Sequence, residues 1–433
     1  MKTVSRRNFL RSLSYGGTAL FVPSVFRPSF LCAQSGGSGN GANVIIVNLL
    51  GGLDGLAAFP LFDGGLVSDI NTKFRPSLAV SPGSVLSISA QGGVSNKIGL
   101  HPEFAPLVRV VGDHMKIIQG YGIPGDPGRS HDTCQVIMSL GRTDVNDPEM
   151  RGFLARVMDH EGWEALQYWA FDVTNPSDVN TEKNSPVRLS DVDSFSNPRT
   201  WWEDQAQGDH SASLRRALLA LQRESTPLAT KYQAESEILH STLEVVQHSI
   251  VNQSVGGNSE GDYSEGWGIG PRLRSVAKIL KAKSLDSSLS FAKKDQVFLV
   301  TQDGYDTHGD QNNTSIPEAT LAMRLRELAH NLAVFYRDVQ LMGAAERTYV
   351  VVYSEFGRTV RQNSLEDTPG AGSDHGHGNN TIVFGGGITP GVIGDPPTQQ
   401  ALNDEDYNAL VPTIDYRDVF SEIFAEVMGI APE

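Results

Sequence analysis

Cysteine, long hydrophobic runs and blocks of like charge are all scarce in this chain of 433 residues. Of its two cysteines, Cys32 lies close to the N-terminus, which leaves Cys134 without a partner and excludes a disulfide-stapled scaffold. No apolar stretch is long enough to span a membrane, so we expect no stable membrane insertion. Without charged low-complexity blocks, we expect most of the chain to be ordered.

Positive charge is also in short supply. The chain has 35 Lys and Arg against 50 Asp and Glu, a formal net charge of −15. Residues 1–33 contain five of the basic residues and no acid, so the chain without them carries −20. An acidic surface disfavours nucleic acids and anionic membranes as partners. A site for an anionic substrate must therefore supply its own local positive charge.

The N-terminus has the pattern of an export signal. Ser5 to Leu10 reads Ser-Arg-Arg-Asn-Phe-Leu, a twin-arginine motif, and a broken apolar stretch and the small residue Ala33 follow it. We expect residues 1–33 to be a twin-arginine signal peptide and residues 34–42, rich in Gly and Ser, to be a flexible linker. The twin-arginine translocase is then a partner during export, and the protein is periplasmic or secreted.

Short apolar runs bounded by turn residues predict buried strands of an α/β domain over residues 43–433. These runs are Asn43–Leu50, Met115–Gln119, Gln296–Thr301, Tyr349–Tyr353 and Thr381–Phe384. A long amphipathic helix, Thr320–Gly343, connects the third run to the fourth, which implies a parallel pair with a right-handed crossover. Apolar spacings of three and four between about residues 175 and 261 predict a helical insertion.

Polar clusters adjoin four of the predicted strands, and together they suggest a metal site. The members are Asp54, Asp306, His308, Glu355, Asp374, His375 and His377. The carboxyl ends of parallel strands lie along one edge of a sheet, where ligands gather. Mixed histidine and carboxylate ligands suit zinc, manganese or iron, whereas oxygen ligands alone suit magnesium or calcium. Any one of these residues alone is better explained as a helix cap or a solvent-facing side chain.

A Gly-rich loop before the predicted helix His131–Leu140 is the candidate site for a nucleophile. Ser130 lies at the helix start, where backbone N–H groups and the helix dipole stabilise an oxyanion, and Thr133 is the second choice. A nearby divalent metal would lower the pKa of such a hydroxyl. A simple N-cap role explains Ser130 nearly as well. Arg129 is placed to pair with a substrate oxyanion or is solvated.

Seven motifs between Ser5 and Gly387 carry a family resemblance: SRRNFL, GGLDGL, GLHPEFAPL, RSHDTCQVIMSLG, GYDTHGDQ, SEFGRT and SDHGHGN. Together they resemble an uncharacterised, twin-arginine-exported branch of the alkaline phosphatase and sulfatase superfamily. The resemblance implies a doubly wound, mostly parallel sheet sandwiched by helices, with metal at its carboxyl edge. By this resemblance Asp54 is a first-strand ligand, Asp306 and His308 bind the other metal, and His375 or His377 is the late histidine.

The sequence departs from the superfamily pattern at three points. Glu355-Phe356 stands in place of an Asp-His pair, so one metal position loses its histidine. The Cys/Ser-x-Pro-x-Arg pattern of sulfatases is absent around Cys134, which argues against a formylglycine nucleophile. Counted back from the Gly that ends the helix, the nucleophile position falls nearer His131 than Ser130, so His131 is a second candidate for the attacking group or a ligand.

Arg358 of SEFGRT has two possible roles, holding Glu355 in place or binding an anionic substrate. The polar clusters predict a divalent metal (zinc, manganese, iron or calcium), and the resemblance implies an exported hydrolase of phosphate or sulfate esters that acts on a small-molecule or glycan ester. The alternative is a non-catalytic protein that binds metal or glycan on the same fold. Glu355-Phe356 favours the alternative, and the dense cluster from Asp306 to His377 favours the enzyme.

Overall fold

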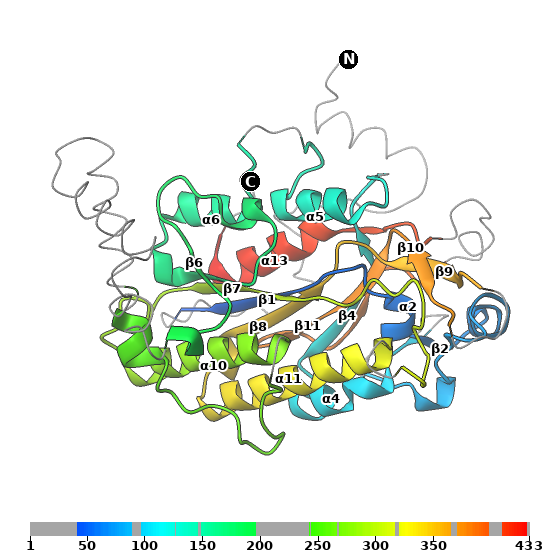
Figure 1. The fold of residues 1–433 in the computed structure, drawn as a ribbon, viewed down its shortest axis with the longest axis horizontal. Coiled ribbons are helices and arrows are strands. Elements are labelled where there is room, and N and C mark those ends of the chain that lie inside the picture. The colour runs from blue at the N-terminus through cyan, green and yellow to red at the C-terminus, as the bar shows by residue number, and fades with distance from the viewer. Residues whose placement is uncertain are drawn as a thin grey trace, which may run out of the picture. The chain divides into compact units, whose positions relative to one another are not determined.

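A nine-stranded sheet runs through the centre of the computed structural model (Figure 1). Its order is β12-β4-β11-β8-β1-β7-β5-β6, and β13 pairs with β4 beside that path. The strands are β1 (Asn43–Leu49), β4 (Met115–Gly122), β5 (Tyr168–Phe171), β6 (Val187–Leu189), β7 (Gln296–Gln302), β8 (Thr348–Tyr353), β11 (Asn379–Gly385), β12 (Gly391–Ile393) and β13 (Ile414–Asp415). Of these nine, β11 alone is antiparallel to its neighbours.

The structure describes residues 41–88, 97–125, 127–145, 149–195, 242, 244–265, 268–316, 320–364, 370–397 and 409–430. These residues lie within one unit of the chain, Leu31–Glu433. The predicted signal peptide, nearly all of the linker and most of the predicted insertion lie outside the described residues. Residues 187–189, which we expected within a helical insertion, form the edge strand β6.

Helices cover both faces of the sheet (Figure 1). One side has α4 (Ala105–Val111), α10 (Ile269–Leu285) and α11 (Leu321–Leu341), and the other has α5 (His131–Leu140), α6 (Phe153–Glu161) and α13 (Tyr416–Met428). The central strands β8, β1 and β7 are therefore buried on both faces, which explains why they read as continuous apolar runs. The predicted α/β class, with a mostly parallel sheet between helices, is confirmed.

The direction of β11 brings an additional segment to the carboxyl edge of the sheet. Because β11 is antiparallel to β8, its first residue, Asn379, lies toward the end of β8 that Glu355 follows. A small hairpin of β9 (Arg358–Gln362) and β10 (Ser373–His375) connects the two strands. The residues between β8 and β11 are thus collected at the edge where parallel strands deliver their ligands.

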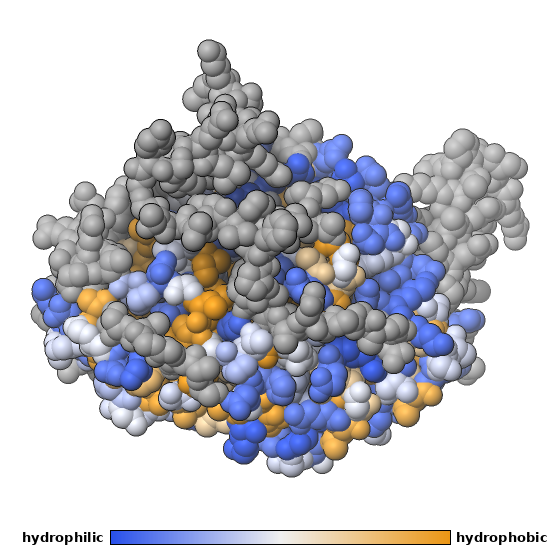
Figure 2. Space-filling view, turned by 180° about the vertical axis from the view of Figure 1, so that it is seen from behind, coloured by the Kyte–Doolittle hydropathy of each residue, from blue (hydrophilic) through white to orange (hydrophobic). Residues whose placement is uncertain are grey.

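The surface of the described residues is mixed in hydropathy on one face of the molecule (Figure 2). On the face shown in Figure 2, hydrophilic residues are interspersed with smaller hydrophobic areas. The exposed large hydrophobic side chains of the described residues are Leu285, Ile316, Leu341 and Val411. No helix in the described ranges combines the length and the apolar composition needed to cross a membrane.

Candidate metal centre

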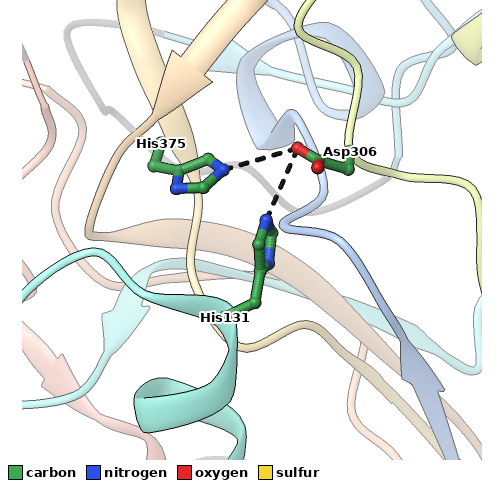
Figure 3. A group of neighbouring side chains, drawn as sticks. All are labelled: His131, Asp306 and His375. Carbon is green, nitrogen blue, oxygen red and sulfur yellow. Dashed lines mark ion pairs between the residues drawn. The ribbon is translucent and has the colours of Figure 1, made fainter.

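Three side chains from separate parts of the chain meet at the carboxyl edge of the sheet (Figure 3). His131 is the first residue of α5, Asp306 lies in the loop after β7, and His375 ends β10. Their ligand atoms all lie within 4.8 Å of one another. The Oδ1 atom of Asp306 is 3.4 Å from Nε2 of His131 and 3.4 Å from Nε2 of His375. Two imidazoles and a carboxylate therefore converge on one point.

His308 adds a third imidazole to this group. Its Nε2 atom lies 3.2 Å from Oδ1 of Asp306 and 2.8 Å from Nε2 of His375. Three Nε2 atoms thus surround a single carboxylate oxygen. We call His131, Asp306, His308 and His375 the donor cluster.

The other ring nitrogen of each histidine faces an oxygen. Nδ1 of His131 lies 2.7 Å from Oε1 of Glu355. Nδ1 of His308 lies 3.0 Å from Oδ1 of Asp374, and Nδ1 of His375 lies 2.7 Å from the carbonyl oxygen of Arg129. Carbonyl and ionised carboxylate oxygens only accept hydrogen bonds, so each Nδ1 carries the proton and each Nε2 presents a lone pair. Histidine ligands of metal ions are commonly oriented in this way.

The Nε2 atom of His131 is a buried polar atom without a hydrogen-bond partner. A buried acceptor left in this state costs free energy, and most such atoms in folded proteins are satisfied. It faces the Asp306 carboxylate at 3.4 Å, which offers no proton when ionised. A cation within the cluster would satisfy both groups, so the residues present fit a metal ion.

Electrostatics keep two members of the cluster, Asp306 and His375, in a form that can bind a cation. Burial alone would raise the pKa of Asp306, but the hydrogen bond and charge of Arg358 outweigh it, so the pKa is lowered. Burial lowers the pKa of His375. The hydrogen bond to Glu355 raises the pKa of His131. Near neutral pH the Asp306 carboxylate is therefore charged and the His375 ring is neutral.

Glu355 supports the cluster from outside it. Its Oε1 atom accepts hydrogen bonds from the N–H of Gly51 at 2.9 Å, from His131, and from Nε2 of Gln135 at 3.1 Å. Its side chain is 1% exposed. Burial raises its pKa, but the hydrogen bond from His131 and its other donors leave the pKa lowered. Gln135 was not identified from the sequence, although it lies one helical turn after His131 and therefore on the same face of α5.

Arg358 connects the segments around the donor cluster through hydrogen bonds. The side chain is buried and donates to four carbonyl oxygens and to the carboxylate of Asp306. The carbonyls are those of Gly51, Gly52, Tyr305 and Ser373. Of the two roles considered from the sequence, binding of a substrate stays a prediction, and the contacts of the described residues include no hydrogen bond from Arg358 to Glu355. The guanidinium holds Asp306 instead.

Asp54 is not brought into the donor cluster. Its carboxylate accepts the N–H of Ala57 at 3.2 Å and caps helix α2 (Gly55–Ala58). It also accepts hydrogen bonds from Arg75 at 2.9 Å and from Gln311 at 2.6 Å, and it is fully buried. Neither partner was identified from the sequence, because each lies in a different loop.

His377, Asp374 and Ser130 also lie outside the donor cluster. The Nε2 atom of His377 lies 2.9 Å from the carbonyl of Ile123, so this ring is bound to the backbone. Asp374 orients His308. Ser130 is exposed at the N-cap position of α5, and its side chain makes no capping hydrogen bond. Arg129 is partly buried and donates to the carbonyl of His375 at 3.2 Å.

One family profile matches this chain, and its description is "protein of unknown function" (DUF1501). It matches residues 274–427. That segment contains Asp306, His308 and His375 but not His131. No curated protein sequence matches the chain.

Solved structures with a similar arrangement include proteins of the alkaline phosphatase superfamily. A protein of this superfamily from Vibrio parahaemolyticus is 11% identical over 85% of this chain and 66% of its own, with a TM-score of 0.38. This chain therefore spans just under two thirds of that protein. Ps i-CgsB in complex with k-i-k-neocarrahexaose is 8% identical (91% and 73% covered, TM-score 0.40). Alkaline phosphatase from the Antarctic bacterium TAB5 is 10% identical (90% and 98% covered, TM-score 0.32).

Proposed function

We propose that the donor cluster binds one divalent metal ion. The observation that carries this proposal is the convergence of three Nε2 lone pairs on one oxygen of Asp306, with every Nδ1 held by an oxygen acceptor. Imidazole and carboxylate donors suit zinc, manganese or iron. Calcium prefers six to eight oxygen ligands, so it fits this nitrogen-rich set poorly.

A single ion is favoured over the pair that the superfamily resemblance implied. Asp54 and Glu355 are the acids expected to serve a second ion. The oxygens of Asp54 are occupied by Arg75, Gln311 and a helix N–H, and those of Glu355 by donors that include His131. Neither carboxylate belongs to the donor cluster.

We propose that the bound ion serves the hydrolysis of phosphate or sulfate esters. A divalent ion of this kind lowers the pKa of water and polarises an ester oxygen. Glu355 holds His131 in the orientation that presents Nε2 to the centre. Arg129, which contacts the backbone of His375, is the cation that we assign to the oxyanion of the ester. A small-molecule or glycan ester would satisfy these contacts.

The sequence left open whether Ser130 or His131 attacks the ester, and we assign different roles to the two residues. The unpartnered Nε2 atom of His131 favours a ligand over an attacking group. Ser130 stays as the hydroxyl that attacks or orients the ester, because it lies exposed at the start of α5 with its side chain uncommitted to capping. The dipole of this helix favours an anion at the same position.

A specific observation favours the second candidate function, a metal- or glycan-binding protein without catalysis. Four protein donors complete the tetrahedral shell of a structural zinc site, whereas catalytic zinc sites keep a position open for water. The exposure of the cluster favours catalysis, since the side chains of Asp306 and His308 are 49% and 45% exposed. Solvent and substrate would then reach the ion from this side.

Export is part of the same proposal. The twin-arginine motif and the small residue at position 33 favour a periplasmic or secreted enzyme that the twin-arginine translocase carries after folding. A metal centre assembled from distant parts of the chain is compatible with that route.

Elemental analysis tests the metal centre. Protein purified without chelators is expected to hold about one equivalent of zinc, manganese or iron, and D306A and H375A are expected to lose it. A wild-type protein that takes up no metal on titration would overturn the proposal. If metal binds, loaded protein is assayed against phosphate monoesters, phosphodiesters and sulfate esters. Turnover that D306A abolishes supports the hydrolase, and stoichiometric metal without turnover of any ester supports the binding protein.

A further inference from the structure

A buried residue outside the donor cluster connects two segments that carry three of its four donors. We call these segments the two loops; they are residues 306–311 after β7 and residues 371–375, which include β10. Gln311 is fully buried. Its Oε1 atom accepts a hydrogen bond from Oγ1 of Thr307 at 3.1 Å and another from Oγ of Ser373 at 2.9 Å. Thr307 separates the two donors of the first loop, and Ser373 lies two residues before the donor of the second. One amide oxygen therefore ties both loops together.

The other end of the same amide is held by Asp54. Nε2 of Gln311 donates to Oδ2 of Asp54 at 2.6 Å. Oδ1 of Asp54 accepts from Arg75, whose guanidinium also donates to the carbonyls of Thr359 and Val360. A carboxylate that already faces an arginine acts as an acceptor, so it requires the NH₂ group of Gln311 on its side. The amide oxygen is consequently directed toward the two hydroxyls.

Backbone hydrogen bonds run in parallel with these side-chain bonds. The N–H of Ser373 donates to the carbonyl of Thr307 at 3.0 Å, and the N–H of Gln311 donates to the carbonyl of Ala371 at 3.1 Å. The two loops are thus paired through their backbones, and the side chain of Gln311 closes the space between them. A small change at Gln311 would alter the separation of the loops.

We propose that Gln311 is a positioning residue for the metal centre, and that Asp54 sets the orientation of its amide. This inference rests on the proposed metal site. Asp54, which the sequence predicted to be a ligand, would then act on the donors indirectly, through its hydrogen bond with Gln311. Residues that support ligands from outside the first shell typically change metal affinity by about 10- to 100-fold when they are replaced.

A charge swap tests this arrangement. Q311E places a second carboxylate against Asp54 within a buried site. The double variant D54N/Q311E exchanges the two groups, so that an amide at position 54 donates to a carboxylate at position 311, which still accepts from both hydroxyls. N331D is the matched control. Asn331 lies on α11, and its fully buried amide makes hydrogen bonds with Ser264 and with the carbonyl of Glu327.

Cobalt(II) is the probe, and its affinity and visible absorption spectrum are the readouts. We expect Q311E to bind cobalt about 10- to 100-fold more weakly than the wild type and with an altered spectrum. D54N/Q311E is expected to recover affinity to within roughly threefold and to restore the spectrum, while N331D loses stability but keeps both cobalt readouts. A spectrum depends on ligand geometry, so a general loss of stability does not imitate this pattern.

The outcomes separate this inference from the metal site itself. A wild-type protein that binds no cobalt overturns the metal site and the positioning role together. Normal cobalt binding by the wild type and by Q311E overturns the positioning role alone, as does a double variant that fails to recover. If Q311E does not fold, T307V and S373A each remove one hydroxyl donor. Unchanged affinity and spectrum in both of these variants would then overturn the inference.

Discussion

The rings of His308 and His375 face each other with their Nε2 atoms 2.8 Å apart. Each ring already donates its Nδ1 proton to an oxygen, so two lone pairs would meet at this distance unless a proton or a cation lies between them. The pair is therefore unfavourable in the neutral apoprotein and favourable once a cation is shared. We therefore expect the stability of the protein to be sensitive to metal.

Removal of metal is expected to lower the melting temperature. A ligand at about 100 times its Kd stabilises the folded state by about 2.7 kcal/mol, which for a chain of this size raises Tm by roughly 3 °C. Treatment with a chelator should reverse that shift in the wild type. H375A should melt at the same temperature with and without chelator, because the shared position is lost. Equal shifts in the two proteins would contradict a role for His375 as a ligand.

Replacement of Arg358 is expected to destabilise the fold. R358A removes a hydrogen-bond donor from four carbonyl oxygens and from the Asp306 carboxylate, and we expect a loss of roughly 3–5 kcal/mol in the free energy of unfolding by urea. R129A, at the edge of the site, should change stability by less than about 1 kcal/mol and raise KM for an anionic ester. An R358A protein with normal stability and only a raised KM would contradict this expectation and support substrate binding as the role of Arg358.

A methyl group at Gly51 is expected to disrupt the centre through the backbone. Gly51 has φ +114°, and an added Cβ would lie 2.4 Å from the backbone nitrogen of Asp306. G51A should therefore lose stability and displace the loop that carries Asp306. G65A is the control, because nothing lies within 4 Å of its Cβ position and its φ is −64°. Similar urea midpoints and metal contents for both variants would contradict this expectation.

Asp178 is expected to make stability fall as the pH rises. Burial raises the pKa of this carboxyl to about 7, with Ser139 as its hydrogen-bond partner. Between the ordinary pKa of about 4 and the folded pKa, the folded state binds a proton that the unfolded state does not, so stability is greatest at low pH and is lost as pH rises through this window.

Urea unfolding at pH 5 and pH 8 measures this effect. Between these values the wild type should lose about 2–3 kcal/mol relative to D178N, because two pKa units of the window lie within that range. D262N, at an exposed position, should follow the wild-type pH profile. Parallel profiles for the wild type and D178N would show that Asp178 keeps an ordinary pKa.

The sequence predicted the central strands of the sheet and the edge at which donors that follow them would lie. β1, β7 and β8 are buried on both faces and so appear as apolar runs, and parallel pairing places the residues that follow them on one edge. Parallel pairing therefore predicted Asp306 and His308 at this edge, whereas His375 precedes its strand in the large sheet and reaches the same edge only because β11 is antiparallel to β8. His131 was predictable only in part, by counting back along its helix, since nothing local reveals what its ring faces.

The roles of the acids could not be predicted, because they depend on partners that are distant in sequence. Asp54 and Glu355 follow strands in the same manner as Asp306. Asp54 differs because Arg75 and Gln311 approach it from separate loops, and Glu355 differs because the start of α5 covers it. Tertiary contacts, rather than residue type or spacing, separate a ligand from a residue that orients one.

The donors also come from distant parts of the chain, and this has a consequence for folding. His131 and the acid that orients it are 224 positions apart, with β7, α11 and β8 between them. No early fragment of the nascent chain contains a complete site, so the proposed ion would be acquired only after long-range structure has formed. Once bound, it would act as a removable cross-link that closes a very long loop, the kind of clip that in theory stabilises a fold most. Loss of the ion would then be a route to unfolding as well as to inactivity.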